Sequence, residues 1–417
     1  MALNALFTGS AALQSNSTAL DVVGNNLANI NTTGFKSQRT LFRDMVYQTL
    51  SPGSGANGTS GGTNPVQLGF GVGVGSVDTQ FSQGAINPTG RALDMAIQGK
   101  GFFTVSDGSR NLFSRSGSFA VDSSGFLVDP NTGFRVQRFG AVGEPSGTQP
   151  GFQVAGDTNV KVPFGAGAQG VPTQNVNYQG NLSSGLAVDQ SATTAIQIFD
   201  AQGSSRTLTV TFTKSATNAF TVSADVSGAT VALSATSLTF DNKGLLTSPE
   251  TIDVTISGIT GVADQTITLN LGTAGQATGL TQFGGVSTAT AINQDGSPSG
   301  TLTSVSVDQA GVLVGQFSNG LTLPLAQLAI AAFNNETGLV REGNNYFSAS
   351  PASGQALTGV AGAGGRGIVQ GSALEGANVD IAIEFSRLII AQRGFQVNAR
   401  TITVANETLQ ELANIVR

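Results

Sequence analysis

The sequence predicts a mainly β protein with terminal α-helices and a nested multidomain layout. Apolar residues recur every seven residues near both ends of the chain, and glycine, serine and threonine are abundant between them. A seven-residue repeat keeps one side of a helix against a partner, whereas glycine-rich sequence of low charge is typical of short strands and turns. Glycine-rich stretches at 51–62 and 359–367 mirror each other. We therefore expect inner coiled-coil helices from both termini, with β-rich middle and outer domains.

The first helix is expected between Asn4 and Ile30, with Gly34 as a stop signal. Before residue 35 the charged side chain is Asp21, and the other polar positions hold Asn, Ser, Thr, Gly and Gln, which favour helix weakly. A free helix of this composition is marginal in water, so we expect packing against neighbours to hold it. Its seven-residue column is Leu6, Leu13, Leu20 and Leu27.

The last helix is expected from Val379 to the C-terminus, with Asn378 as N-cap and Asp380 placed favourably for the helix dipole. One such column alone is equally typical of an amphipathic helix lying on its own domain. Columns at both termini favour a paired coiled coil, and we expect both columns to form the assembly interface. The second column is Ile381, Leu388, Phe395, Ile402, Leu409 and Val416.

Turn chemistry marks several hairpins between the two expected helices. Four times the chain places Asp three residues before Gly between apolar runs, and Asn319-Gly320 adds a fifth candidate. Calcium ligation is an alternative, but single acids flanked by Ser, Ala or Gln provide too few oxygens. We therefore predict hairpin corners at Asp122 to Gly125, Asp200 to Gly203, Asp241 to Gly244, and Asp308 to Gly311.

Composition limits the possible functions. Histidine and cysteine are absent, so the commonest general base, the thiol nucleophile, the usual zinc ligands and disulfides are all missing. The run Gly69 to Gly75 lacks the third glycine of a dinucleotide-binding turn. The net charge is -6 without a run of Lys or Arg, which argues against nucleic acid or a membrane as partner. We expect no catalytic residue, no cofactor and no metal.

The beginning of the chain bears on localisation. No basic residue precedes Lys36 and no unbroken apolar block is present, so we expect neither a secretory signal peptide nor a membrane span. The low charge and the missing cysteine nevertheless favour an extracellular structural protein. Such a protein needs an export route that cleaves no leader.

Several stretches resemble the bacterial flagellar axial proteins, the family of rod and hook subunits. Within "NNLANINTTGFK" the family motif falls on Asn26, Leu27, Asn29, Asn31, Gly34 and Phe35. Chain length, "YQGNLSSG" at 178–185 and "FNNETGLVREGNNYF" at 333–347 are most similar to the hook members. The segments that carry the resemblance are 25–36, "TGRALDMAIQGKGFF" at 89–103, "FSRSGSFAVDSSGFLVDPNTG" at 113–133, and 378–417.

The resemblance implies a nested domain layout, which agrees with the helices at both ends and the mirrored glycine-rich connectors. It comprises a terminal helical coiled-coil domain, a connecting segment with a glycine-rich loop, an inner β-rich body built from both halves of the chain, and an inserted outer β domain. In that order the expected ranges are 1–32 with 372–417, 33–75, 76–146 with 293–371, and 147–292.

The resemblance implies a structural subunit that polymerises into the flagellar hook, a curved tubular universal joint that carries motor torque from rod to filament. It implies partners as well: further copies of the chain, the rod, hook cap and hook-filament junction proteins, and the flagellar export apparatus. Two alternatives remain open. One is a distal rod protein, a rigid drive shaft, which the chain length disfavours; the other is a secreted β-rich adhesin or glycan hydrolase with a coiled-coil stalk. The glycine-rich segment 51–64 resembles the insertion of the straight distal rod, so this segment by itself does not indicate bending.

Overall fold

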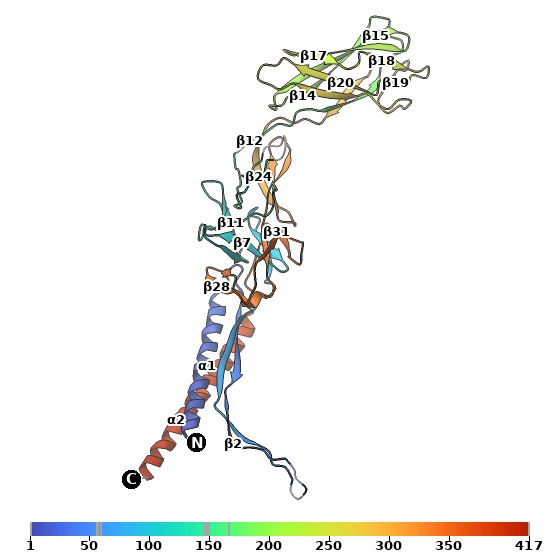
Figure 1. Ribbon diagram of the computed structural model, residues 1–417. Helices are drawn as coiled ribbons and strands as arrows, with labels where there is room; N and C mark the ends of the chain where they lie inside the picture. The colour runs from blue at the N-terminus through green and yellow to red at the C-terminus, as the bar shows by residue number, and fades with distance from the viewer. Residues whose placement is uncertain (1, 56–57, 59–60, 146–150, 166, 416–417) are drawn as a thin grey trace.

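The computed structural model describes residues 2–55, 58, 61–145, 151–165 and 167–415. The molecule is elongated (Figure 1), with the terminal helices at one end, an inner β body in the middle and an outer β domain at the other end. Helix α1 (Ala2–Ala28) and helix α2 (Ile381–Ile415) pack side by side. The fold is therefore mainly β with terminal helices, as the sequence predicts.

The start of α2 differs from the sequence prediction. A carboxylate oxygen of Asp380 accepts the backbone N–H of Ile383 at 3.0 Å, so Asp380 is the N-cap. The prediction that Asn378 caps the helix is wrong. The side-chain oxygen of Asn378 accepts the N–H of Ser37 at 2.7 Å, and its amide donates to the carbonyl of Gln80 at 2.8 Å. Asn378 thus joins the chain before α2 to the chain after α1.

The connecting segment forms a long antiparallel ribbon. Strand β1 (Gln38–Asp44) pairs with β4 (Val72–Thr79), and β2 (Tyr47–Ser51) pairs with β3 (Val66–Gly69). The β1/β4 part lies along α1, where the Ser15 hydroxyl donates to the carbonyl of Val72 at 3.2 Å. The β2/β3 part projects away from the helices (Figure 1). Residues 56, 57, 59 and 60 of the expected glycine-rich loop lie outside the described residues.

The inner body combines both halves of the chain in two apolar clusters, a larger one and a smaller one that contains Phe102 and Phe347. One sheet has the order β28-β29-β8-β7-β11-β10-β9, with β27 on β7 and β30 on β27; a second has the order β12-β24-β25-β26; β6 pairs with β31 and β5 with β32. The strands are β5 (Ile86–Pro88), β6 (Met95–Gln98), β7 (Phe102–Ser106), β8 (Asn111–Ser114), β9 (Ala120–Val121), β10 (Leu127–Val128), β11 (Arg135–Val136), β12 (Gly167–Ala168), β24 (Gly300–Val307), β25 (Val312–Phe317), β26 (Thr322–Gln327), β27 (Ile330–Ala332), β28 (Val340–Gly343), β29 (Tyr346–Ser348), β30 (Leu357–Gly359), β31 (Ile368–Gly371) and β32 (Ala373–Glu375), with a 3-10 turn at Glu336–Gly338.

The outer domain is a β-sandwich with a core of its own. One sheet has the order β17-β20-β21-β13-β22 with β23 on β13, and the other has the order β14-β15-β16-β18-β19. In β15 the buried Leu208, Val210 and Phe212 alternate with threonines on the outer face, as the two-residue strand period requires. The strands are β13 (Asn175–Asn181), β14 (Ser191–Phe199), β15 (Ser205–Ala216), β16 (Ala219–Val226), β17 (Thr230–Leu233), β18 (Ser237–Phe240), β19 (Leu246–Ser248), β20 (Thr251–Ser257), β21 (Gln265–Asn270), β22 (Leu280–Thr281) and β23 (Thr290–Gln294).

The two cores suggest where one domain ends and the next begins. Val160, Val162 and Ala168 belong to the core of the inner body, although they fall within the range expected for the outer domain. Val171 and Ser297 exchange backbone hydrogen bonds of 3.0 and 2.9 Å where the chain enters and leaves the outer domain. We therefore propose limits near these two residues rather than at 147 and 292.

The predicted hairpin corners are confirmed. The glycines of all four Asp-x-x-Gly sequences have φ between +77° and +85°, where glycine is favoured. In each turn the Asp carboxylate accepts the N–H of the residue four positions later at 2.8–2.9 Å. Asn319-Gly320 forms the corner between β25 and β26 in a similar way, with Gly320 at φ +82°. The aspartate side chains therefore bind the backbone of their own turns.

Candidate assembly interface

The seam between α1 and α2 is made of small side chains. Gly9 and Gly394 lie within it: an added Cβ would be 2.9 Å from Cγ1 of Ile402 and 2.7 Å from Oδ1 of Asn16, respectively. Small residues of this kind let two helices approach closely. The buried positions recur every three or four residues on α1 and at intervals of seven and fourteen on α2: Gly9, Ala12, Ser15, Ala19, Val23 and Asn26 of α1, and Glu384, Ala391 and Ala405 of α2.

The columns predicted from the sequence flank this seam rather than fill it. Ile381 and Phe395 are 54% and 39% exposed, and Val416 lies outside the described residues. In a single chain these side chains remain partly exposed to solvent. Their role in assembly stays a prediction. The half-buried members are Leu6, Leu13, Leu20, Leu27, Leu388, Ile402 and Leu409.

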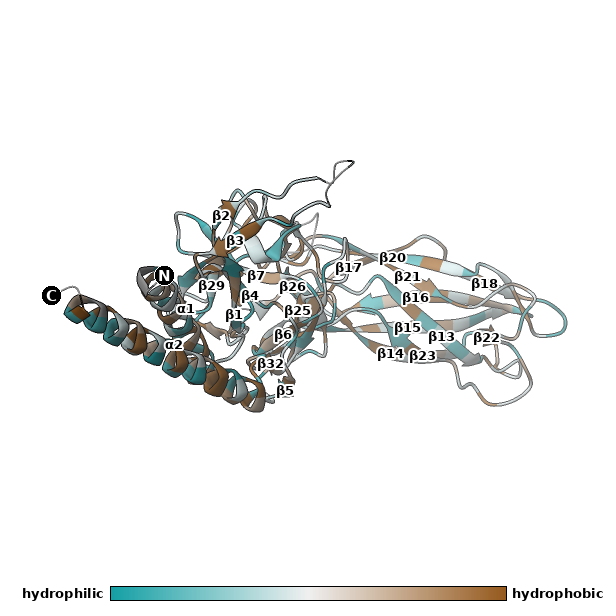
Figure 2. Ribbon diagram, turned by 90° about the horizontal axis from the view of Figure 1, so that it is seen from below, coloured by the Kyte–Doolittle hydropathy of each residue, from teal (hydrophilic) through white to brown (hydrophobic). Residues whose placement is uncertain are grey.

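A further column on α2 escaped the sequence analysis. Ile383, Ile390, Val397 and Val404 are 51%, 72%, 62% and 59% exposed. Each precedes a member of the seam column at 384, 391, 398 and 405, so it lies about 100° around the helix from the seam. In Figure 2 apolar residues recur along the length of α2. This column also repeats every seven residues in the sequence. It was missed because the column at 381–416 has the same interval and more members.

Two hollows border the exposed column. Ile390 lines a largely apolar hollow of about 250 Å³ between α1, β1 and α2, which Val22 and Phe42 also line. Val397 and Val404 line another, of about 660 Å³. The column therefore stands on an uneven surface into which apolar side chains of a partner can pack.

A buried ion cluster fastens the helical end to the inner body. The ammonium of Lys36 lies 2.6 Å from one oxygen of Glu375, and the guanidinium of Arg115 lies 3.4 Å from the other. Lys36 also donates to the carbonyl of Ser82 at 2.7 Å, and Arg115 to that of Gly99 at 2.8 Å. Burial lowers the pKa of Lys36 and that of Arg115, while the charge of Glu375 acts in the opposite direction.

Asn26 of the family motif joins α1 to both of its neighbours. Its side chain is fully buried and exchanges hydrogen bonds with the backbone of Gln38, accepting the N–H at 2.9 Å and donating to the carbonyl at 2.7 Å. The same amide lies 3.2 Å from a carboxylate oxygen of Glu384 on α2. The carboxamide of asparagine carries its donor and its acceptor on two separate atoms without charge, so one side chain can bond both the N–H and the carbonyl of Gln38.

The remaining motif residues form the turn after α1. Phe35 is buried beneath the guanidinium of Arg341, whose centre lies 5.1 Å from the ring. The side-chain amide of Asn29 donates to the carbonyl of Asn25 at 2.9 Å. Gly34 donates its N–H to the carbonyl of Glu375 at 2.7 Å. Leu27 is half-buried and Asn31 is exposed.

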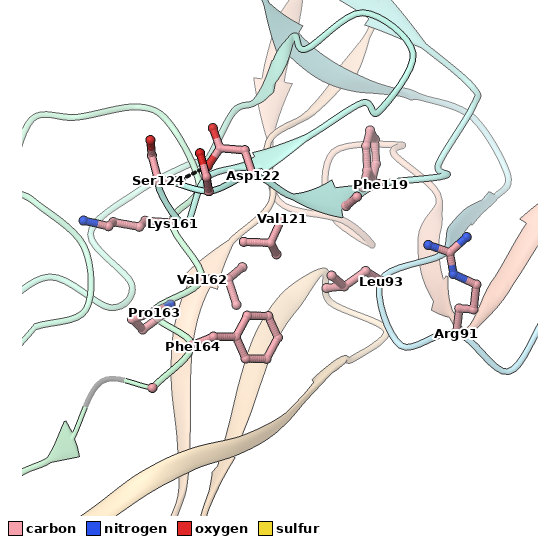
Figure 3. A pocket seen from close by; sticks show the side chains of 14 residues that line it. Arg91, Leu93, Phe119, Val121, Asp122, Ser124, Lys161, Val162, Pro163 and Phe164 are labelled. Atoms are coloured by element: carbon pink, nitrogen blue, oxygen red, sulfur yellow. Dashed lines mark hydrogen bonds between the residues drawn. The ribbon is translucent and has the colours of Figure 1, made fainter.

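A hollow on the surface of the inner body has a mixed lining. It measures about 850 Å³, and Figure 3 shows Leu93, Val121, Val162 and Phe164 around it. The carboxylate of Asp122 accepts backbone N–H groups within its own turn. Among the described residues, no group of three or more acidic side chains is placed to hold a metal ion. The hollow is a surface depression lined by apolar side chains and also by polar ones such as Arg91 and Lys161.

Family models match three parts of the chain. The flagella basal body rod protein model matches residues 6–36, the flagellar basal body protein FlaE D2 domain model matches 185–297, and the flagellar basal body rod FlgEFG protein C-terminal model matches 370–415. Together these matches define the class of protein as a flagellar axial protein, as the terminal motifs predict.

Full-length relatives identify the member of this class. The flagellar hook protein FlgE of Borreliella burgdorferi is 36% identical over 443 residues, covering 99% of this chain and 99% of the relative, and that of Treponema pallidum is 35% identical, covering 100% of both. The flagellar basal-body rod protein FlgG of Bacillus subtilis is 28% identical, covering 100% of both. The chain belongs to the flagellar hook protein family.

Gly34→Ala is expected to destabilise the junction between α1 and the inner body. Gly34 has φ +70°, and an added Cβ would lie 2.5 Å from the backbone nitrogen of Ser116. Left-handed backbone and overpacking together cost about 2–4 kcal/mol. Native-state hydrogen exchange at the amides of β7 measures this loss. Gly90→Ala is the matched control, because Gly90 has φ +74° but nothing within 4 Å of an added Cβ. Equal losses in the two variants would contradict the close approach.

Glu375→Gln is expected to lower the free energy of unfolding of the inner body by about 3–5 kcal/mol, because two buried cations lose their shared anion. The same exchange measurement applies. Glu342→Gln is the control, since Glu342 pairs with Arg110 at the surface at 3.2 Å. A surface pair contributes little, so this control is expected to leave exchange almost unchanged. Similar losses for both variants would contradict the anchoring role of the cluster.

Proposed function

We propose that the protein polymerises into the flagellar hook, a curved tube that carries torque from rod to filament. The observation that carries the proposal is the exposed apolar column Ile383, Ile390, Val397 and Val404 on α2. Water exposure of this column costs hydrophobic free energy that burial against another copy would recover, at about 25 cal/mol per Å². A head-to-tail contact between unlike surfaces continues without closing, as a filament requires.

The projecting ribbon supplies more surface of the same kind. Val46, Leu50 and Val66 are 76%, 61% and 54% exposed. An isolated two-stranded ribbon is marginally stable in water, so β2 and β3 gain from being covered. We propose that the ribbon and both predicted helix columns pack against neighbouring copies near the axis of the tube.

The outer domain suits contacts that slide. Its exposed faces carry short neutral side chains, for example Thr193 and Thr211 with oxygens 3.3 Å apart on neighbouring strands. Such groups exchange protein and water hydrogen bonds at little cost. In a curved tube, neighbours on the inner side of the bend approach and those on the outer side separate. Weak, wet contacts allow this change as the tube rotates.

The proposal extends to partners and place. It assigns the protein to the extracellular part of the flagellum, in contact with the rod, the hook cap and hook-filament junction proteins after passage through the export apparatus, and it assigns no catalytic activity. No helix in the described part of the chain is long and apolar enough to cross a membrane. The rod relative also spans the whole chain, but at 28% identity against 36% and 35% for the two hook relatives, so a rod role is not favoured.

Ile390→Asp with Val397→Asp is expected to raise the critical concentration for polymerisation more than about 100-fold, because two apolar contacts are replaced by buried charges. Sedimentation and electron microscopy of the full-length chain measure this change. Val188→Asp with Val286→Asp is the matched control, with both positions exposed in the outer domain. Normal tubes from the α2 variant, with wild-type helicity, would overturn the assignment of this face.

Removal of residues 172–296 is expected to leave a polymer with altered curvature. Val171 and Ser297 already lie side by side, so a short turn can replace the outer domain without disturbing the inner core. The axial contacts remain, while the sliding contacts are lost. Curvature and stiffness are measured from images of the tubes. Tubes indistinguishable in curvature from wild type would contradict a role for the outer domain in bending.

A further inference from the structure

The far side of α2 carries exposed charges in a fixed order. Arg393 and Arg400 come first, and Glu407 and Glu411 follow toward the C-terminus. Intervals of seven and four residues place all four within about 40° of one another around the helix, at about 100° per residue. In a chain with 11% charged residues, such a row on one side of one helix requires an explanation.

A lone chain gains nothing from this arrangement. None of the four side chains forms an ion pair with another of the described residues. Glu407 and Glu411 are four residues apart, a spacing at which like charges repel. Arg400 and Glu407 are separated by about 10 Å along the helix axis, which is too far for a direct pair.

The row borders the exposed apolar column. Arg393, Arg400 and Glu407 each follow a member of that column, Ile390, Val397 and Val404, by three residues. Adjacent positions three apart form one continuous surface on a helix. Charges that flank an apolar seam commonly set the register and orientation of helix pairs. A partner that covers the column would therefore also contact the charges.

The order of the charges selects the register of a second copy. Two parallel α2 helices without stagger place Arg beside Arg and Glu beside Glu. A shift of 11 residues places Glu411 of one copy beside Arg400 of the next, a shift of 14 places Glu407 beside Arg393, and a shift of 18 places Glu411 beside Arg393. A shift of 7 pairs Glu407 with Arg400 but also places Arg400 beside Arg393, where the like charges repel. At about 1.5 Å per residue the three favourable shifts correspond to about 16–27 Å.

We infer that the acidic end of α2 binds the two arginines on α2 of an adjoining parallel copy, and that these pairs restrict the axial stagger to about 16–27 Å. This inference rests on the proposed function, because it needs copies that assemble in one direction. An antiparallel pair would satisfy the same charges but closes into a dimer and cannot grow. The surface is thus an ionic register between subunits, beside the apolar contact that holds them.

Charge reversal in the full-length chain tests the inference. Arg393→Glu with Arg400→Glu makes the row wholly acidic and is expected to raise the critical concentration about tenfold at 0.1 M salt. In 1 M salt the difference from wild type is expected to shrink, because the Debye length falls to about 3 Å. Adding Glu407→Arg and Glu411→Arg restores complementarity with reversed signs, so this quadruple variant is expected to polymerise like wild type.

The matched control is Lys100→Glu with Lys243→Glu, which changes the net charge equally at exposed positions of other domains. Tenfold loss in this control, or failure of the quadruple variant to recover while its monomer keeps wild-type helicity, overturns the inference. So do antiparallel dimers, or a polymer reconstruction with unstaggered α2 helices. A wild-type chain that forms no polymer overturns the proposed function itself. Normal assembly of the variant Arg393→Glu with Arg400→Glu overturns only the ionic register.

Discussion

The ion cluster of Lys36, Arg115 and Glu375 is the contact on which the rest of the architecture depends. It joins the segment after α1, the inner body and the segment before α2 at one fully buried point. A buried charge is tolerated only with its partner present, so the cluster forms when all three segments are in place. Asn26 and Asn378 add neutral hydrogen bonds around the same junction. Both chain ends are thereby held to the body, and the helix pair acquires a defined direction.

Local patterns were predictable from the sequence, and long-range ones were not. The helices, the β character and the Asp-Gly corners depend on spacings of seven residues or fewer, which a sequence displays directly. In the ion cluster, Lys36 and Glu375 are 339 positions apart, and no sequence pattern predicts a pair at such a separation. Asp380 caps the helix instead of the predicted Asn378, because tertiary hydrogen bonds occupy the side chain of Asn378. The sequence analysis predicted a connecting segment where β1 to β4 form a ribbon. The pairing was missed because the strands that pair lie on either side of a long loop.

The candidate interface was predicted in part for the same reason. Seven-residue columns indicated that both helices pair, but a helix column does not state which partner it meets. Gly9 and Gly394 lie in the seam within the chain, whereas larger residues such as Leu13 and Leu20 are only half-buried. Size therefore misled the assignment: close packing of two helices requires small side chains, whereas bulky apolar ones remain available to other surfaces. The column at Ile390 became recognisable only when its exposure was known.

The continuity of the outer domain in the chain has a consequence for the order of folding. Every member of its core lies between residues 176 and 280, whereas the core of the inner body draws on 95–168 and 302–369. Contacts of short sequence separation form sooner, because less chain entropy is lost before they close. The outer sandwich can thus reach its native state before residues 302–369, the second part of the inner core, are in place. A chain delivered end first would then acquire structure from its periphery inward, with the axis completed last.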